Sequence, residues 1–182
     1  QALHERLEQQ SLNGGQVVVI GGGPTGIEAA TEINGRYPSL EVMLVSDSQA
    51  GAFKGEQVRA HIAQALQDQG IEVRQGKRVF AVSPQSIQLS DEKIAADIVV
   101  WAGGFIPPGL AADAGIRVNE RRQILVDPTL RSLSHPNIFA VGDSAMAVEE
   151  PGAPMRMSLF VAIVSGAQAA DNLAAILKSK TP

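Results

Sequence analysis

Cysteine is absent from the 182 residues, and histidine occurs only at His4, His61 and His135. The lack of cysteine excludes disulfide bonds, thiolate zinc sites and Cys-x-x-Cys redox pairs within this chain. The three histidines are widely spaced, so we expect no metal centre. If the protein moves electrons, a bound organic cofactor has to carry them.

Aromatic side chains and basic charge are also scarce. The sequence has five Phe, one Trp and one Tyr, too few for the stacking platforms that bind single-stranded nucleic acid. A net charge of -4 provides no basic surface for a phosphate backbone. We therefore expect no nucleic-acid partner, and a composition of 45% hydrophobic and 19% charged residues is typical of a soluble globular protein.

One long apolar run, "LFVAIVSGAQAADNLAAIL" at 159–177, raises the question of a membrane span. Gln168, Asp171 and Asn172 interrupt it, and a central Asp alone costs about 2.5 to 3.5 kcal/mol on insertion scales. We therefore expect a buried amphipathic helix. Residues 1–15 contain no apolar core of the signal-peptide type, so we expect a cytoplasmic protein.

Hydrophobic periodicity in the first 76 residues alternates between helix and strand. This order predicts an α/β fold with a parallel, doubly wound sheet. Gly35 and Gly70 are expected to stop the second and third helices. The expected helices are 2–10, 24–34 and 54–69, and the expected strands are 16–20, 41–47 and 71–76.

The pattern then changes to short strands without helices between them. Segments 78–84, 86–90 and 93–101 predict an antiparallel meander, which would complete a Rossmann-like domain of three layers. Two further strands are expected at 123–132 and 137–143, and a last helix at about 158–177. Pro107 and Pro108 suggest a boundary, so we divide the chain into a linking helix (1–12), a first domain (13–106) and a C-terminal segment (107–182).

The segment "VVVIGGGPTGIEAA", residues 17–30, places a glycine motif between an expected strand and an expected helix. Gly21 allows the tight turn, Gly23 lets a pyrophosphate approach the backbone, and Gly26 lets helix and strand pack closely. The anion would lie at the helix N-terminus, where unpaired amides favour negative charge. The motif therefore predicts dinucleotide binding.

The usual acidic partner of this motif lies about twenty residues further on and binds the adenosine ribose. Ser46 stands at that position, and Asp47 follows it. Asp47 could bind the ribose or could cap the following turn, and a serine at this place does not exclude NADPH. We therefore expect NAD(P)H, with NADH slightly favoured.

Two further polar residues are candidates for the site. Glu28 lies among small apolar neighbours on the expected helix and is either solvent-facing or close to the nicotinamide end of the cofactor. In the segment "HPNIFAVGDSA" (135–145), an expected strand ends in Gly142 and Asp143. Asp143 could accept hydrogen bonds from a ribityl or ribose chain, or could cap the next segment.

These segments, together with "ADIVVWAGGF" (96–105), resemble three ordered motifs of the two-dinucleotide-binding flavoproteins, the pyridine nucleotide-disulfide oxidoreductase superfamily. The amino-acid sequences of the three motifs are most similar to those of type II NADH dehydrogenases and of apoptosis-inducing-factor-like NAD(P)H:quinone oxidoreductases. The resemblance implies an FAD-dependent NAD(P)H dehydrogenase with a quinone-like acceptor. Residues 13–106 would then bind NAD(P)H, and 107–182 would be the C-terminal part of a split FAD-binding domain.

The resemblance also implies a role for each matching residue. The NAD(P)H contacts would be Gly21, Gly23, Pro24, Thr25 and Gly26, with Glu28 near the nicotinamide as the candidate catalytic residue. Gly103 and Gly104 would line the passage between the two domains. Asp143, beside Gly142, would bind the ribityl or pyrophosphate part of FAD.

The sequence departs from this family in two respects: it contains no first FAD glycine motif ahead of the NAD domain, and the family's C-terminal dimer or membrane-anchoring region is not seen after Leu177. We therefore expect a fragment that is catalytically silent alone. For the parent protein, the resemblance is compatible with a homodimer and with peripheral membrane contact on the cytoplasmic side. Two alternatives stay open: a reductase of a protein electron carrier, and a non-catalytic NAD(H)-binding regulatory module.

Overall fold

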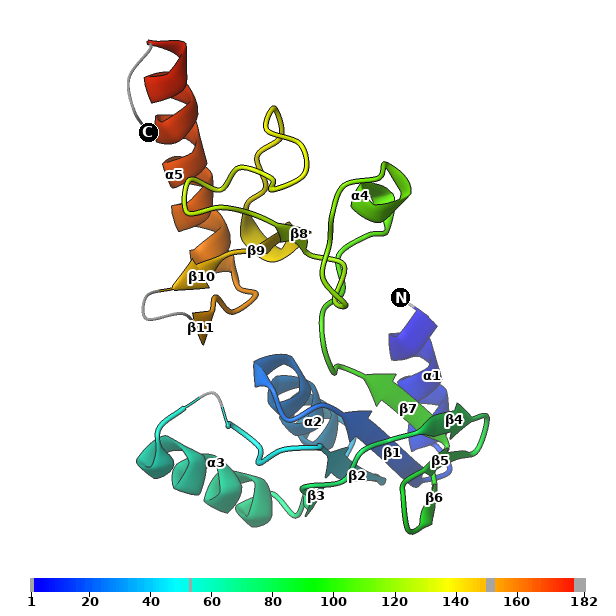
Figure 1. The fold of residues 1–182 in the computed structure, drawn as a ribbon. Helices are drawn as coiled ribbons and strands as arrows, with labels where there is room; N and C mark the ends of the chain where they lie inside the picture. Colours follow the sequence, from blue (N-terminus) through cyan, green and yellow to red (C-terminus); the bar gives the residue numbers. More distant parts are fainter. Residues whose placement is uncertain (1, 53, 150–152, 179–182) are drawn as a thin grey trace. The chain divides into compact units, whose positions relative to one another are not determined.

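The computed structural model describes residues 2–52, 54–149 and 153–178. Its internal contacts divide it into two compact units, Gln1–Gly104 (unit 1) and Phe105–Pro182 (unit 2). The helices of unit 1 are α1 (Ala2–Ser11), α2 (Pro24–Arg36) and α3 (Glu56–Asp68) (Figure 1). Its strands are β1 (Gly15–Ile20), β2 (Leu40–Val45), β3 (Glu72–Arg74), β4 (Ala81–Ser83), β5 (Ser86–Gln88), β6 (Lys93–Ala95) and β7 (Ile98–Trp101).

A four-stranded parallel sheet in the order β3-β2-β1-β7 forms the centre of unit 1. Val17 of β1 is in register with Val42 of β2 and with Ile98 of β7. The predicted strand–helix alternation is thereby confirmed. Because β1 has a parallel neighbour on both sides, its carboxyl end lies between the ends of β2 and β7.

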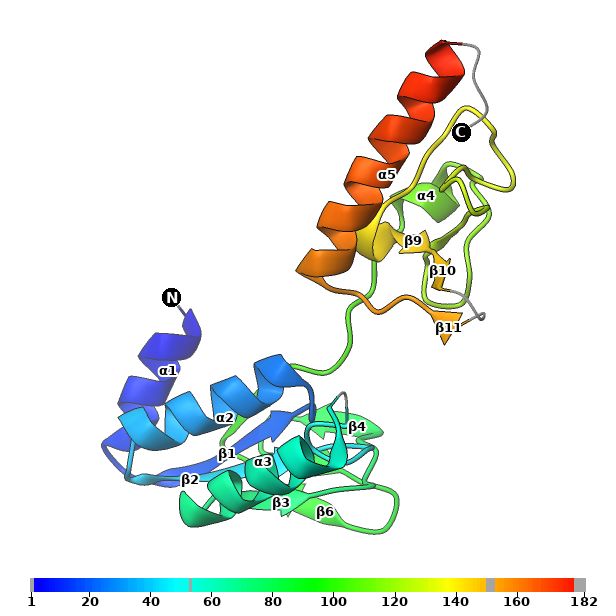
Figure 2. The ribbon, with the colours of Figure 1, turned by 90° about the vertical axis from the view of Figure 1, so that its left-hand side faces the viewer.

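Both faces of this sheet are covered, so unit 1 has three layers. Val17 and Val19 pack with buried residues of the helices, among them Ala30 and Leu66. Figure 2 shows α2 and α3 in front of the strands. The alternate residues Val18 and Ile20 pack with the opposite layer, the antiparallel meander β4-β5-β6; its buried members are Ile87, Leu89 and Ile94. Because successive side chains of a strand point to opposite faces of the sheet, β1 contributes alternate residues to two hydrophobic cores.

The segment 93–101, expected to be one strand, is two. β6 belongs to the meander and β7 to the parallel sheet. Asp97 lies between them, and its backbone amide donates to the carbonyl of Gln16 at 2.9 Å while its carboxylate accepts from the Gln16 amide at 2.8 Å. These two hydrogen bonds hold the chain where it leaves one sheet and enters the other.

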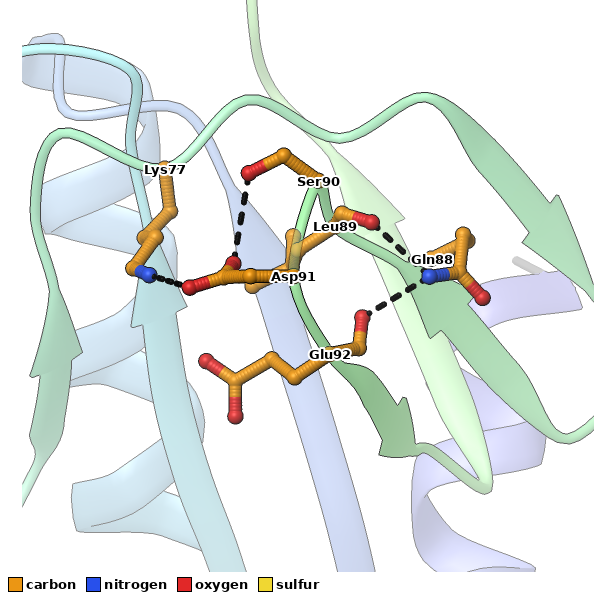
Figure 3. Close-up of polar contacts among 6 residues, drawn as sticks. All are labelled: Lys77, Gln88, Leu89, Ser90, Asp91 and Glu92. Carbon is orange, nitrogen blue, oxygen red and sulfur yellow. Dashed lines mark hydrogen bonds and ion pairs between the residues drawn. The ribbon is translucent and has the colours of Figure 1, made fainter.

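The turn between β5 and β6 is tied to the segment after β3 (Figure 3). Lys77 binds the carboxylate of Asp91, and the Ser90 hydroxyl donates to the same carboxylate at 3.2 Å. The hydrogen bond from Lys77 holds the pKa of Asp91 below its ordinary value. The Lys77 amide donates to the carbonyl of Ser46 at 2.9 Å, so this contact also fixes the end of β2.

The end of α2 differs from the prediction. The helix was expected to stop at Gly35, but it continues to Arg36. Tyr37 caps it, with its amide donating to the carbonyl of Ile33 at 2.9 Å. Pro38 follows, and because a residue before proline disfavours helical angles, the proline rather than the glycine ends the helix.

The described part of unit 2 has little regular structure apart from its last helix. It contains α4 (Leu110–Asp113), β8 (Ile124–Leu125), the 3-10 helix η1 (Gly142–Ser144), β9 (Ala145–Met146), β10 (Val148–Glu149), β11 (Ala153–Pro154) and α5 (Leu159–Leu177). β8 pairs with β9 in parallel, and β10 pairs with β11 antiparallel. A small core consists of Ile124, Ala140 and Ala145, with four partly buried apolar residues around it.

The strands expected at 123–132 and 137–143 are wrong beyond Ile124–Leu125. Elsewhere these segments meet only in single bridges, Val126 with Ser132 and Arg131 with Phe139. In the first segment Asp127 gives the reason, because its carboxylate accepts from the amides of Thr129 and Arg131 at 2.8 and 3.1 Å and bends the chain into a turn. Burial alone would raise the pKa of Asp127, but these bonds and that of the Thr129 hydroxyl outweigh it and lower the pKa.

Helix α5 agrees with its predicted range but not with its predicted burial. Within its own unit, its buried residues are polar, namely Ser165 and Asn172. Six of its large apolar residues are exposed: Leu159, Phe160, Ile163, Val164, Leu173 and Leu177. By length and composition alone, α5 could cross a membrane.

Candidate functional site

The glycine motif forms a bend at the carboxyl end of β1. The Gly21 amide donates to the carbonyl of Val45 at 2.8 Å, and the Ala102 amide donates to the carbonyl of Ile20 at 2.8 Å. Gly21 has φ +129°, a backbone conformation that residues with a side chain rarely adopt. The bend is therefore fixed from both sides, by the ends of β2 and β7.

Two glycines of the bend leave no room for a side chain. A Cβ atom at Gly26 would lie 1.8 Å from the carbonyl oxygen of Gly21, and one at Gly21 would lie 2.8 Å from the backbone of Ala102. In each case the neighbour is backbone, which cannot rotate away. Helix α2 and strand β1 can therefore approach this closely only with glycine at both positions.

Gly23 is the opposite case, since a Cβ there would meet no atom of the described residues within 4 Å. Gly23 is the N-cap of α2 and no side chain caps the helix start. Pro24 occupies the first turn, and Pro24 and Thr25 are exposed. The first amides of α2 therefore lie beside open space, and the helix dipole favours an anion at this end. The arrangement fits a diphosphate.

Ser46 and Asp47, at the end of β2, have different environments. Ser46 is 4% exposed, and a Cβ at Gly22 would lie 2.4 Å from its hydroxyl oxygen. The same hydroxyl accepts a bond from the Ser48 amide at 3.3 Å. Ser46 is therefore buried against Gly22 and supports the bend. Asp47 is exposed and is the side chain at the end of β2 that is available to a ligand.

The following loop also supports the bend, a role that the motif did not reveal. The Gly51 amide donates to the carbonyl of Gly22 at 2.9 Å. The backbone of Ala50 would lie 3.3 Å from a Cβ at Gly22, and the Ala50 amide donates to the side chain of Gln75 at 3.2 Å. The only sequence signal for this support is the glycine at 51, whose φ is +75°.

Glu28 lies on α2 with its side chain exposed. Among the described residues, its carboxylate has no hydrogen-bond or ion-pair partner. The structure of unit 1 therefore matches the solvent-facing alternative, and proximity to a nicotinamide remains a prediction.

Gly103 and Gly104 follow β7 and adjoin the bend. A Cβ at Gly103 would lie 3.5 Å from the carbonyl of Ile20 and 3.8 Å from the Cα of Gly21. Gly104 has φ +76°, and a Cβ there would meet no neighbour. The structure thus brings Gly21, Gly26 and Gly103 together, although they are separated by up to 82 positions in the sequence.

In unit 2, Gly142 and Asp143 lie at the start of η1, against α5. The Gly142 amide donates to the Ser165 hydroxyl at 2.9 Å, and a Cβ at Gly142 would lie 3.0 Å from that of Ala162. Asp143 is exposed. Sequence reasoning missed Ser165, whose only signal is a hydroxyl inside the apolar run 159–177. The Gly-Asp corner is therefore held by α5, with a carboxylate available to a hydroxylated ligand.

Known proteins show the same fold and related sequences. Two NADH dehydrogenase-like proteins of Mycobacterium tuberculosis are each 38% identical over 162 residues, covering 78% of this chain and 40% of theirs. The type II NADH:quinone oxidoreductase of Haemophilus influenzae is 25% identical over 180 residues, covering 90% of this chain and 40% of its own. The crystal structure of a pyridine nucleotide-disulfide family oxidoreductase from Enterococcus faecalis matches with TM-score 0.74 at 24% identity, covering 87% of this chain and 39% of that one.

These matches confirm the Rossmann-like α/β fold class. The chain spans about 40% of the length of these curated relatives. The sequence model of one family matches residues 2–169, which include the glycine bend of unit 1 and the Gly-Asp corner of unit 2. The chain therefore belongs to the pyridine nucleotide-disulphide oxidoreductase family.

Proposed function

We propose that this chain is the NAD(P)H-binding part, with a portion of the FAD-binding domain, of an FAD-dependent NAD(P)H dehydrogenase that reduces a quinone-type acceptor. One observation carries the proposal: the rigid glycine bend leaves open space at Gly23, beside an uncapped helix start. Family membership supports this proposal, as do the names of the curated relatives.

In unit 1 the chain binds and orients the dinucleotide. The amides of Thr25 and Gly26, which follow Pro24, bind the pyrophosphate, and the exposed Thr25 hydroxyl is available to a phosphate oxygen. Asp47 accepts from the adenosine ribose at the end of β2. Because hydride transfer needs alignment and no obligatory protein base, the main contribution of these residues is positioning.

In unit 2 the Gly142–Asp143 corner holds part of the flavin cofactor. Gly142 has φ +59°, and its missing side chain lets α5 pack against the corner at Ala162. Asp143 supplies an exposed acceptor for ribityl hydroxyls. When bound, FAD supplies an acceptor for the nicotinamide hydride and passes the electrons onward. The residues of the corner only bind and orient it.

Calorimetric titration of NADH, NADPH and FAD into the 182-residue chain tests the binding roles. We expect NADH or NADPH to bind in the micromolar to millimolar range, about 4 to 8 kcal/mol. FAD is expected to bind weakly or not at all, since the chain spans only part of its relatives. A flat titration with both nicotinamide nucleotides would contradict the proposal.

The acceptor is a question for the whole flavoprotein. Purified and loaded with FAD, it should oxidise NADH with a soluble quinone faster than with a rubredoxin- or ferredoxin-type carrier. The reverse preference would favour the carrier-reductase alternative. No activity with either acceptor, despite nucleotide binding, would favour a regulatory module.

For location we propose the cytoplasm, with peripheral contact to the cytoplasmic side of the membrane, and for assembly a homodimer. The exposed apolar residues of α5 supply the surface on which the membrane part of this proposal rests. Fractionation of cells should release the whole protein from membranes with salt or carbonate. Retention after a carbonate wash would instead indicate an integral membrane protein.

A further inference from the structure

Trp101, the only tryptophan of the sequence, ends β7 beside the glycine bend. It is in register with Ile20, the residue before Gly21. Its indole Nε1–H donates to the carbonyl of Gly103 at 2.7 Å. The side chain is 60% exposed, whereas Ile98 at the other end of the strand is 2% exposed. Trp101 is therefore oriented by a hydrogen bond, not by burial in the core.

The order of the strands places Trp101 on the side of the glycine bend where the nicotinamide half of a dinucleotide would lie. β1 lies between β2 and β7, so Asp47 and Trp101 lie on opposite sides of the bend. A dinucleotide has its pyrophosphate in the middle. With that group at the start of α2 and the adenosine ribose towards Asp47, the nicotinamide half extends towards the end of β7.

We propose that the indole of Trp101 stacks against the nicotinamide ring of the bound dinucleotide. The inference rests on the proposed function, because it needs the pyrophosphate at the bend. Its physical basis is a flat apolar ring on a residue that is 60% exposed, with its one donor already satisfied by Gly103. The positive charge of oxidised nicotinamide adds an attraction to the indole face.

Gly103 and Gly104 allow such a contact. A Cβ at Gly104 would meet nothing within 4 Å, and the nearest neighbours of a Cβ at Gly103 lie at 3.5 Å or more. No side chain of these two residues competes with a ligand for the space beside the indole. The carbonyl of Gly103 accepts from the indole Nε1–H and so holds the ring in place.

The test compares NAD⁺ with ADP-ribose, which lacks only the nicotinamide. Because the chain has one tryptophan, fluorescence excited selectively at tryptophan, and not at Tyr37, reports Trp101 alone. Saturating NAD⁺ should protect the indole from quenching by acrylamide, while saturating ADP-ribose should protect it much less. Equal protection by both ligands, or protection by neither, would overturn the inference.

Calorimetry with variants gives a second, independent readout. Trp101→Ala should weaken NAD⁺ and NADH binding about two- to tenfold and leave ADP-ribose binding unchanged. Trp101→Phe keeps a flat ring and should retain most of the affinity. Phe80→Ala is the matched control, since Phe80 is a 65% exposed aromatic residue of the same unit whose amide bonds to Gln88 in the meander.

The two proposals fail differently. If Trp101→Ala weakens ADP-ribose and NADH equally, or weakens neither, the stacking is wrong and dinucleotide binding stands. If the unsubstituted chain binds none of the ligands, ADP-ribose included, the proposed function itself fails. Thermal melting of each variant identifies any loss of fold, and the acrylamide experiment on the unsubstituted chain decides the matter without a variant.

Discussion

Gly26 and Gly23 are three positions apart, yet they should respond to substitution in opposite ways. A Cβ at Gly26 would lie 1.8 Å from the carbonyl oxygen of Gly21, and real Cβ contacts are not shorter than 3.0 Å. The bend and α2 would have to separate by more than an ångström. That movement breaks the bond from the Gly21 amide to Val45, now 2.8 Å long.

We therefore expect Gly26→Ala to lower the free energy of unfolding by at least about 2 kcal/mol, as overpacked sites do. For a unit of this size that corresponds to a fall in melting temperature of about 8 °C or more. Circular dichroism during heating measures it. Binding of NADH should fall as well, because the bend itself is displaced.

Gly23→Val should instead leave the stability of the fold nearly unchanged and abolish NADH binding. Gly23 has φ −79° and ψ 177°, which any residue adopts, and its Cβ position is open. The free energy of unfolding should change by less than about 1 kcal/mol, mostly from a poorer N-cap. The valine side chain would occupy the space that a diphosphate needs, so calorimetry should detect no NADH binding.

The result that refutes this reasoning is equally specific. A Gly26→Ala protein with unchanged melting temperature would show that α2 does not pack against the bend as described. A stable Gly23→Val protein that binds NADH like the unsubstituted chain would place the phosphates elsewhere. The pair thus separates an error in the fold from an error in the site.

Three further changes test other parts of the structure. Asp47→Asn should favour NADPH over NADH by about fivefold, about 1 kcal/mol, because it removes a charge that repels the 2′-phosphate; an unchanged ratio in calorimetry would place Asp47 away from the ribose. Asp127→Ala should destabilise unit 2 by about 1 to 3 kcal/mol. Folding lowers the pKa of Asp127, so its contribution to the free energy of unfolding is fully present above pH 3.8, the ordinary pKa, and is lost as the pH falls through the lower pKa of the folded protein. Melting curves recorded at decreasing pH would measure this loss. Ser165→Ala leaves the Gly142 amide without its acceptor and should cost about 1 to 3 kcal/mol in urea unfolding, whereas Ser144→Ala, at an exposed hydroxyl, should cost less.

Local patterns predicted the parallel half of unit 1 well. The buried run Val17–Ile20 shows that both faces of β1 are covered, and the glycines that follow mark the bend. These features depend on neighbours in the sequence, so they are visible without a structure. The same holds for α5, whose start and end agree with the pattern.

The errors arose where a distant residue decides the structure. Nothing near Asp97 shows that β6 and β7 separate, because the partner that fixes this point is Gln16, 81 positions away. The burial of Ser46 likewise depends on Gly22 lying directly over it. Pattern reasoning identified Ser46 as a candidate but could not tell that its side chain supports the bend and does not face a ligand.

Segment 137–143 shows a further limit. Its apolar residues suit a strand, but a strand also needs a partner, and here only Phe139 forms a bridge, with Arg131. Composition indicates that a segment prefers an extended backbone. It does not indicate whether another segment is available to pair with it.

The inverted burial of α5 has a consequence for handling the protein. Ser165 accepts a hydrogen bond from the Gly142 amide, and Asn172 donates one to the Thr129 carbonyl. Because mild detergent competes for apolar contacts and not for buried hydrogen bonds, α5 should stay attached to the rest of unit 2 in detergent. The exposed apolar residues of α5, which include Phe160 and Ile163, form a surface that favours association with other copies of the chain. Sedimentation should therefore show clustering of the chain that grows with concentration and disappears in detergent, while circular dichroism stays constant.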